Sequence, residues 1–216
     1  LVLGAVSSGC EACLAPVLPQ IFPLLVQSLR DAVQEVRAIA CWVLSRFSCW
    51  IARCVEGDDT HDEGVHLLHA VFTGLLSALL DPSPKVQATS CAALSSLMQS
   101  CDCETLLSAL PQLMEQVHLA VQNYGLKNRL LLMDLLGVVS ETFGAELSRT
   151  GNLGILTVFM PLLMTYYLES GPDEAVLAVS MECLQSLCNA FKVHVAPYAP
   201  KIFSRAVTIM RETLDA

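Results

Sequence analysis

Three groups of cysteine, histidine and acidic residues in this chain could bind a metal or carry thiol chemistry. Cys10 and Cys13 have the C-x-x-C spacing of zinc ligands and redox dithiols, but no second knuckle accompanies them and they lie at a predicted helix end. Cys101 and Cys103 flank one aspartate and are most simply explained by a turn. The third group could ligate a metal, although a polar loop entering a helix also explains it: His61, Asp62, Glu63, His66 and His69.

No catalytic arrangement can be assembled from the remaining residues. The sequence contains no glycine-rich phosphate loop and no G-x-S-x-G nucleophile elbow. We therefore predict that the chain is not an enzyme, and that it uses no catalytic residue, metal or cofactor. A metal or thiol enzyme remains an alternative function class, and it would require Cys or His side chains to converge in the fold.

Residues that suggest a binding chemistry lie at helical spacing. Ile39, Trp42 and Arg46 share one predicted helix face, and Asp134 and Glu141, seven residues apart, share another. Glu182 follows in a later helical run. The formal net charge of −9 disfavours nucleic acid and favours basic partners. Two structural explanations stay open, because on spacing alone Trp42 fits a core position between repeats and the acids fit a solvated helix face.

The elements that position these residues repeat along the chain. The stretch Ala15–Phe22 (APVLPQIF) returns as Ala196–Phe203 (APYAPKIF), and fainter copies occur at Leu110–Leu113 and Met160–Leu163. Each copy opens an apolar run that leads through a break into a second run rich in Ala, Ser, Leu and Cys. A period of about 40 to 50 residues is typical of HEAT or armadillo solenoids. We predict an all-α fold, an α-solenoid (superhelix) of HEAT-type antiparallel helix hairpins, whose second helices line the concave face.

The predicted organisation is a single solenoid segment over residues 1–216. Residues 1–13 are the second helix of a preceding repeat, and 196–216 begin the next one, as expected for an excised fragment. A polar, acidic loop is predicted over 55–64, and a proline turn over 81–84. The full hairpins are predicted over 14–53, 65–100, 106–143 and 154–191.

The composition fits a thick helical core. The chain is 54% hydrophobic and 15% charged, against about 25% charged in typical soluble domains. The best membrane-spanning candidate, 151–168, is uncharged but contains polar residues and a proline and has no basic flank, so we expect no membrane insertion. The ten cysteines are expected to be free thiols in a reducing compartment, because several lie inside apolar helical runs: Cys41, Cys91, Cys183 and Cys188.

Five segments, in this order along the chain, carry a resemblance. They are Leu1–Ala5 (LVLGA), Val36–Phe47 (VRAIACWVLSRF) with Trp50, Lys127–Asn128, Met133–Gly137 (MDLLG) and Glu182–Leu184 (ECL). Together they resemble the middle of the transportin family of β-karyopherin nuclear import receptors. The similarity runs from end to end, and the C-W-x-L-S-R helix is its most specific part, because generic HEAT proteins share the Asp turn and the Val-Arg start but not this helix.

The resemblance implies a shuttling receptor of the cytoplasm and nucleus. Such a receptor binds cargo proteins with basic proline-tyrosine nuclear localisation signals, passes nucleoporins and releases its cargo to the GTPase Ran. By position, Leu1, Ile39 and Trp42 match the apolar surface for the Pro-Tyr end of the signal, and Arg46 matches a basic residue beside it. The positions that match acids meeting the basic stretch of the signal are Asp134, Glu141 (where an aspartate is expected) and Glu182.

One position departs from the family pattern. The second helix of the second repeat ends there in a glutamate cluster, whereas this chain has Gln99, with the Ser96 hydroxyl nearby. We therefore expect the arginine before Pro-Tyr to be bound more weakly or differently. The alternative function is a HEAT scaffold for protein complexes unrelated to transport, which would bury Trp42 between repeats. An import receptor instead requires Trp42 to be partly exposed.

Overall fold

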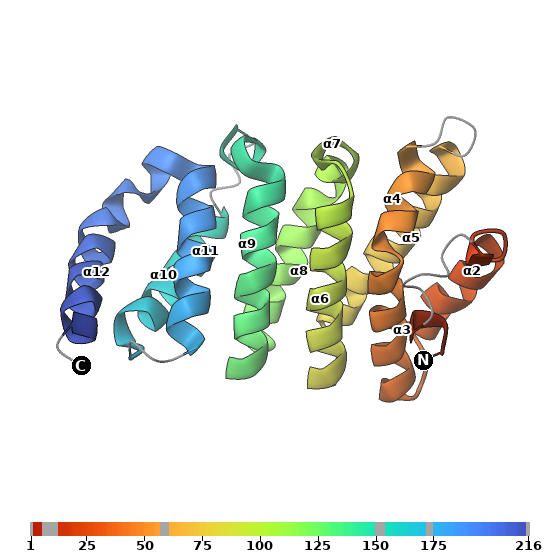
Figure 1. The fold of residues 1–216 in the computed structure, drawn as a ribbon, viewed down its shortest axis with the longest axis horizontal. Helices are drawn as coiled ribbons and strands as arrows, with labels where there is room; N and C mark the ends of the chain where they lie inside the picture. The colour runs from red at the N-terminus through yellow and green to blue at the C-terminus, as the bar shows by residue number, and fades with distance from the viewer. Residues whose placement is uncertain (1, 6–12, 57–60, 150–153, 172–174, 215–216) are drawn as a thin grey trace. The chain divides into compact units, whose positions relative to one another are not determined.

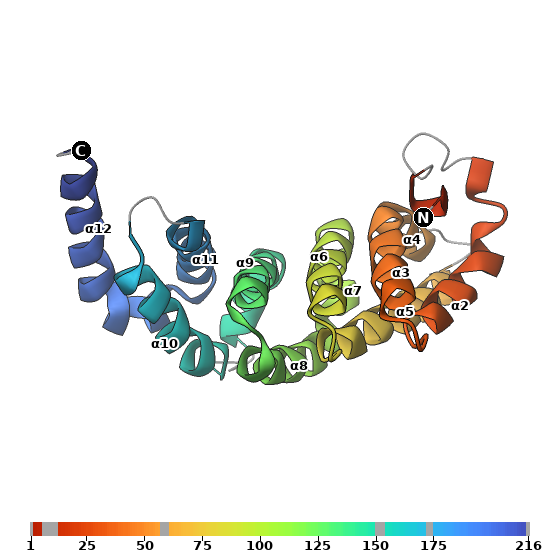
Figure 2. The same ribbon diagram turned by 90° about the horizontal axis from the view of Figure 1, so that it is seen from below.

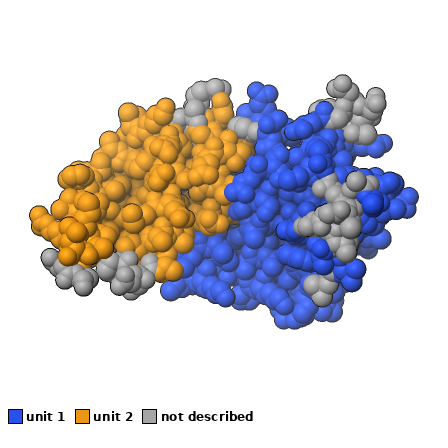
Figure 3. All heavy atoms as spheres, viewed as in Figure 1, with its two compact units in different colours: residues 1–132 blue, residues 133–216 orange. Residues whose placement is uncertain are grey.

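The computed structural model describes residues 2–5, 13–56, 61–149, 154–171 and 175–214 (Figure 1). All regular structure in these ranges is helical, which confirms the predicted all-α fold of HEAT-type helix hairpins. The chain divides into two compact units, residues 1–132 and 133–216, which are described separately (Figure 3).

Unit 1 consists of two layers of helices (Figure 2). One layer contains α2 (Leu18–Ser28), α5 (His61–Leu79) and α8 (Leu110–Asn123), and the other contains α3 (Gln34–Arg46), α4 (Ser48–Glu56) and α6 (Pro84–Ser100). A short helix α7 (Cys103–Leu106) and a 3-10 turn η1 (Leu107–Ala109) lead into α8. Proline lies in the first turn of α2, α6 and α8, where its missing N–H has no helical partner to lose.

The second helix of the hairpin predicted over 14–53 is two helices in the structure, α3 and α4. Residue Phe47 interrupts it, and α3 and α4 meet at an angle of 53°. The Phe47 ring is buried and contacts Phe22 edge to face, with ring centroids 6.0 Å apart, and Trp50 stacks on Phe22 at 5.0 Å. This aromatic cluster fixes the direction of α4. The following loop is also shorter than predicted, because α5 already begins at His61.

Polar contacts join successive repeats of unit 1. The Arg37 guanidinium donates to both carboxylate oxygens of Asp81, at 2.6 and 2.9 Å. Gln87 stands at the repeat position of Arg37 and donates to the Asp81 carbonyl oxygen at 2.8 Å. In the next repeat, Asn128 donates to the Gln87 side-chain oxygen and to the Pro84 carbonyl, both at 2.8 Å. The contact between the first two repeats is therefore an ion pair, whereas the contact to the next repeat consists of hydrogen bonds from a neutral amide.

A buried tyrosine also connects two repeats of unit 1. The Tyr124 side chain is 2% exposed, and its hydroxyl donates to the Leu79 carbonyl at 2.6 Å. Replacing Tyr124 by phenylalanine leaves that buried oxygen without this donor, so we expect a loss of about 1–3 kcal/mol of unfolding free energy in a denaturant titration. Tyr166→Phe, at a partly exposed position, is the control, with an expected change within about 0.5 kcal/mol. Equal effects of the two variants would contradict a stabilising role for this contact.

Unit 2 begins within α9 (Leu126–Arg149) and continues with α10 (Gly154–Glu169), α11 (Ala175–Phe191), the 3-10 segment η2 (Lys192–Tyr198) and α12 (Ala199–Leu214). A kink interrupts α9 at Gly144, whose φ of +38° lies in the region that favours glycine. The hairpin predicted over 106–143 ends one residue before this kink. The sequence predicted that the Met160–Leu163 copy of the repeat opens an apolar run. In the structure this copy lies within α10, because the helix begins at Gly154 and Pro161 lies inside it.

The last helix, α12, is attached to α10 along one side. The Tyr167 hydroxyl donates to the Ile202 carbonyl at 3.0 Å, and the Arg205 guanidinium donates to the Ser170 carbonyl at 2.7 Å. Another face is apolar and uncovered in the described structure, with Phe203 exposed by 72% although its repeat equivalent Phe22 is fully buried.

Among the described residues, no single helix is long and apolar enough to cross a membrane; α3 and α4 together meet that test by length and composition, although they are bent.

Candidate functional site

The predicted face of α3 is present in unit 1. Ile39 and Trp42 are partly buried and Arg46 is exposed, at the spacing that places them along one side of the helix. The other side of α3 is fixed in the core by five fully or nearly fully buried side chains: Ala38, Ala40, Cys41, Val43 and Leu44. The core packing of α3 therefore determines which way the face points.

Trp42 is neither enclosed nor free. Its ring lies against Gly4 in the helical segment 2–5, so closely that a Cβ added to Gly4 would clash with a ring carbon. The Trp42 residue as a whole is partly exposed. Leu1, the other apolar residue assigned to this surface, lies outside the described residues.

Ser96 and Gln99 lie on α6, which packs beside α3 and α4. Gln99 is exposed, and Ser96 is partly buried with its hydroxyl donating to the Ala92 carbonyl of its own helix at 3.0 Å. The Ser100 hydroxyl lies 3.6 Å from the Cys49 sulfur, so the last turn of α6 is adjacent to α4. At the end of α6, Gln99 therefore presents an exposed, uncharged polar side chain three residues after Ser96.

The three predicted acids are exposed on two neighbouring helices of unit 2. Asp134 and Glu141 lie on α9, and Glu182 lies on α11. The Ser186 hydroxyl of α11 donates to a Glu141 carboxylate oxygen at 2.9 Å, which ties the two helices together. Burial and, to a smaller extent, the charge of Asp134 raise the pKa of Cys183 to about 12. The Asp134 carboxylate therefore influences Cys183, the residue that follows Glu182 on α11.

The groups considered for metal binding do not form such a site in the described part of the chain. No three His, Cys, Asp or Glu side chains gather there at metal-binding range. His66 and His69 are exposed on α5, and His69 lines an apolar hollow with residues of α5, α7 and η1. Cys101 lies in a bend, as predicted, and Cys10 lies outside the described residues.

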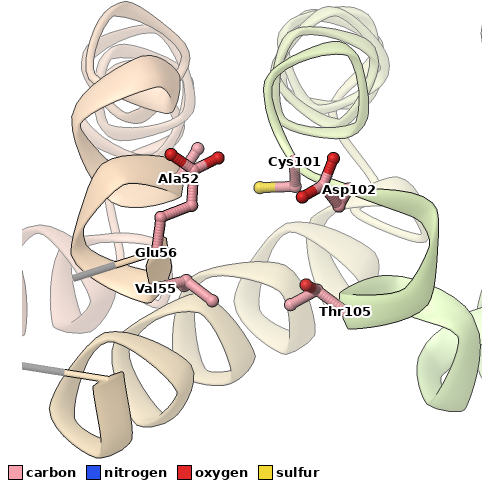
Figure 4. Close-up of a pocket in the computed structure, with 6 residues that line it drawn as sticks. All are labelled: Ala52, Val55, Glu56, Cys101, Asp102 and Thr105. Carbon is pink, nitrogen blue, oxygen red and sulfur yellow. The ribbon is translucent and has the colours of Figure 1, made fainter. Parts of the chain in front are cut away.

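Sequence reasoning missed a small cleft in unit 1. Its walls are the end of α4 and the turn between α6 and α7 (Figure 4). The sequence pattern did not reveal this cleft, because it predicted α3 and α4 as one helix. It also predicted only a turn at Cys101. The residues that line the cleft are Ala52, Val55, Glu56, Cys101, Asp102 and Thr105.

Comparison with known proteins identifies relatives over the whole chain. A family model described as a HEAT-like repeat matches residues 1–47. Transportin-1 of Homo sapiens is 30% identical over 214 residues, which cover 99% of this chain and 22% of the relative. Transportin-1 of Oryza sativa subsp. japonica is 31% identical over 211 residues, covering 98% of this chain and 23% of the relative. The chain thus spans less than a quarter of the length of these curated relatives.

Solved structures show the same fold. Crystal structures of Kap121p bound to Pho4p and of Kap121p bound to Nup53p each superpose with a TM-score of 0.76, at 20% identity, over 97% of this chain and 19% of theirs. The sequence similarity to transportins covers both units, and the structural similarity covers the same helix pairs. The chain is therefore similar over its whole length to a segment of the transportins, and it shares the helical-repeat fold of the Kap121p structures.

Proposed function

We propose that this chain is the part of a nuclear import receptor that binds cargo signals of the basic proline-tyrosine type. The observation that carries the proposal is the face of α3, where a partly exposed Trp42 stands between Ile39 and Arg46. The relatives that this chain resembles over nearly its whole length are named transportins. In this reading, the α3 face receives the Pro-Tyr end of the signal, and the exposed acids of unit 2 receive its basic stretch.

The physical properties of the two partners support this assignment. A short basic signal is disordered when free, so binding must offset its loss of conformational entropy. A receptor face built on packed helices is formed in advance and adds little further ordering cost. The tryptophan supplies a large desolvated contact, whereas exposed carboxylates such as Asp134 mainly increase the association rate and the dependence on salt.

The remaining parts of the proposal concern partners and place. We expect contacts with nucleoporins, as in the structural neighbour that is bound to Nup53p, and release of cargo by Ran-GTP. Both processes would use the longer receptor, and the protein would shuttle between cytoplasm and nucleus. The proposed role is transport by binding, without catalysis, consistent with relatives named transportin and importin.

A peptide titration tests the proposal. A fluorescein-labelled peptide with a basic stretch, an arginine and a terminal Pro-Tyr should raise its anisotropy on addition of the chain, and the same peptide with Ala-Ala for Pro-Tyr should bind much more weakly. Equal binding of the two peptides would contradict recognition of Pro-Tyr. No binding of either peptide would favour the scaffold alternative.

Gln99→Glu tests how the signal arginine is bound. A carboxylate at this exposed position should strengthen binding by a few tenths to about 1 kcal/mol, because it adds one ion pair to the arginine. The gain should vanish for a peptide with alanine in place of that arginine. Gln122→Glu on α8, in the other helix layer, makes the same charge change and should leave the affinity unaltered. An equal gain for both peptides, or no gain, would mean that the end of α6 does not contact the arginine.

A further inference from the structure

We propose that Cys49 and Cys101 are a redox-sensitive pair that forms a reversible disulfide on oxidation by hydrogen peroxide, linking α4 to the end of α6 in unit 1.

The two thiols belong to adjacent elements, because Cys49 lies in the first turn of α4 and Cys101 directly follows α6. The Cys49 sulfur lies 3.6 Å from the hydroxyl oxygen of Ser100, the residue that precedes Cys101. Cys101 lines the cleft opposite Ala52, which follows Cys49 by three residues and therefore lies on nearly the same side of α4. Figure 4 shows the Cys101 sulfur pointing across the cleft toward α4. The helix that carries Cys49 is in contact with the helix that Cys101 follows.

The electrostatic surroundings agree with this placement. Burial, followed by the charges of Asp102, Glu56 and Cys49, raises the pKa of Cys101 to about 11. Cys49 is thus near enough for its charge to act on Cys101. Cys101 remains a protonated thiol at neutral pH, whereas Cys49 is exposed to solvent and to dissolved oxidants.

These differences assign the two cysteines separate roles. The Cys49 thiolate attacks one oxygen of hydrogen peroxide, which breaks the O–O bond and gives a sulfenic acid and hydroxide. The Cys101 sulfur then attacks the Cys49 sulfur, the S–S bond forms, and the sulfenic hydroxyl leaves with the Cys101 proton as water. Two thiols are oxidised by two electrons in total, and one peroxide is reduced to two waters. A thiol reductant reverses the bond, as is typical of transient disulfides in reducing compartments.

The proposal predicts a specific cross-link. The full chain is treated with a small excess of hydrogen peroxide, blocked with N-ethylmaleimide, digested with trypsin without reduction and analysed by mass spectrometry. Trypsin cleaves after Arg46 and Arg53, so Cys49 is isolated in a seven-residue peptide, 47–53. That peptide should be recovered bound to the one containing Cys101, with two hydrogens lost, and dithiothreitol should separate them.

Matched serine variants identify the partners. Cys49→Ser and Cys101→Ser should each abolish the cross-link, whereas Cys13→Ser and Cys103→Ser should retain it. Oxidised wild type should also melt several degrees above its reduced form, because the bond closes a long loop, and Cys101→Ser should show no such difference. Recovery of Cys49 only as sulfinic acid, or bonded to another cysteine, would overturn the proposal.

Discussion

Replacing Trp42 by alanine should weaken binding of a proline-tyrosine signal peptide by roughly thirtyfold or more, the largest single-residue effect expected in this chain. Truncating a buried tryptophan anchor costs about 2 kcal/mol or more, whereas an exposed ion pair contributes about 0.2–1 kcal/mol. Trp42 is suited to such a role, because its ring lies against Gly4 and the residue is partly exposed. Anisotropy titration of one labelled peptide against both proteins measures the change.

The matched control is the other tryptophan. Trp50 stacks on Phe22 within the aromatic cluster of unit 1, so Trp50→Phe should lower stability while leaving peptide affinity nearly unchanged. Circular dichroism of Trp42→Ala must show the wild-type helix content, since the substitution also removes a contact with the segment 2–5. If Trp42→Ala binds like wild type, the anchor assignment is wrong.

The second large effect is expected in unit 2. Reversing both acids of α9, with Asp134→Lys and Glu141→Lys, should weaken binding of a basic signal peptide about tenfold or more at low salt, because attraction is replaced by repulsion. Binding of a peptide without the basic stretch should change much less. The difference between the two peptides should shrink as salt rises to 0.15 M and above, where the Debye length is about 8 Å or less.

A charge-matched variant separates local from general electrostatics. Glu104→Lys with Glu115→Lys changes the net charge equally at exposed positions of α7 and α8. An equal loss of affinity there would show that only net charge matters. Because Glu141→Lys also removes the hydrogen bond from Ser186, the unfolding midpoint of the α9 variant should be measured alongside. Salt-independent binding of wild type would contradict the assignment of these acids.

The repeated helix pairs were predictable because local features define them. Proline at Pro84 and at Pro111 lies in the first turn of a helix, and the spacing of Ile39, Trp42 and Arg46 predicts that they share one helix face. The break at Phe47 was not predictable, since apolar residues continue through it and the cause is a tertiary contact with Phe22. The helical start at His61 was not predictable either, because it falls inside a segment that reads as a polar loop.

For the candidate site, the sequence predicted the residues of each helix face but not their hydrogen bonds. The sequence identifies Ser96 as a hydroxyl group but not its partner, and in the structure this hydroxyl donates to the Ala92 carbonyl one turn earlier. The link from Ser186 to Glu141 joins residues far apart in the chain, so no local pattern signals it. The cleft that holds Cys101 likewise depends on the packing of α4 against α6.

The apolar face of α12 affects the colloidal behaviour of the chain. Phe203, Met210 and Leu214 are exposed along one side of that helix, and such a stripe attracts other apolar surfaces. The net charge of −9 keeps chains apart in dilute buffer, but added salt screens this repulsion while it screens the attraction of a basic peptide. Salt therefore promotes self-association and peptide release together, and only light scattering at each salt concentration distinguishes the two.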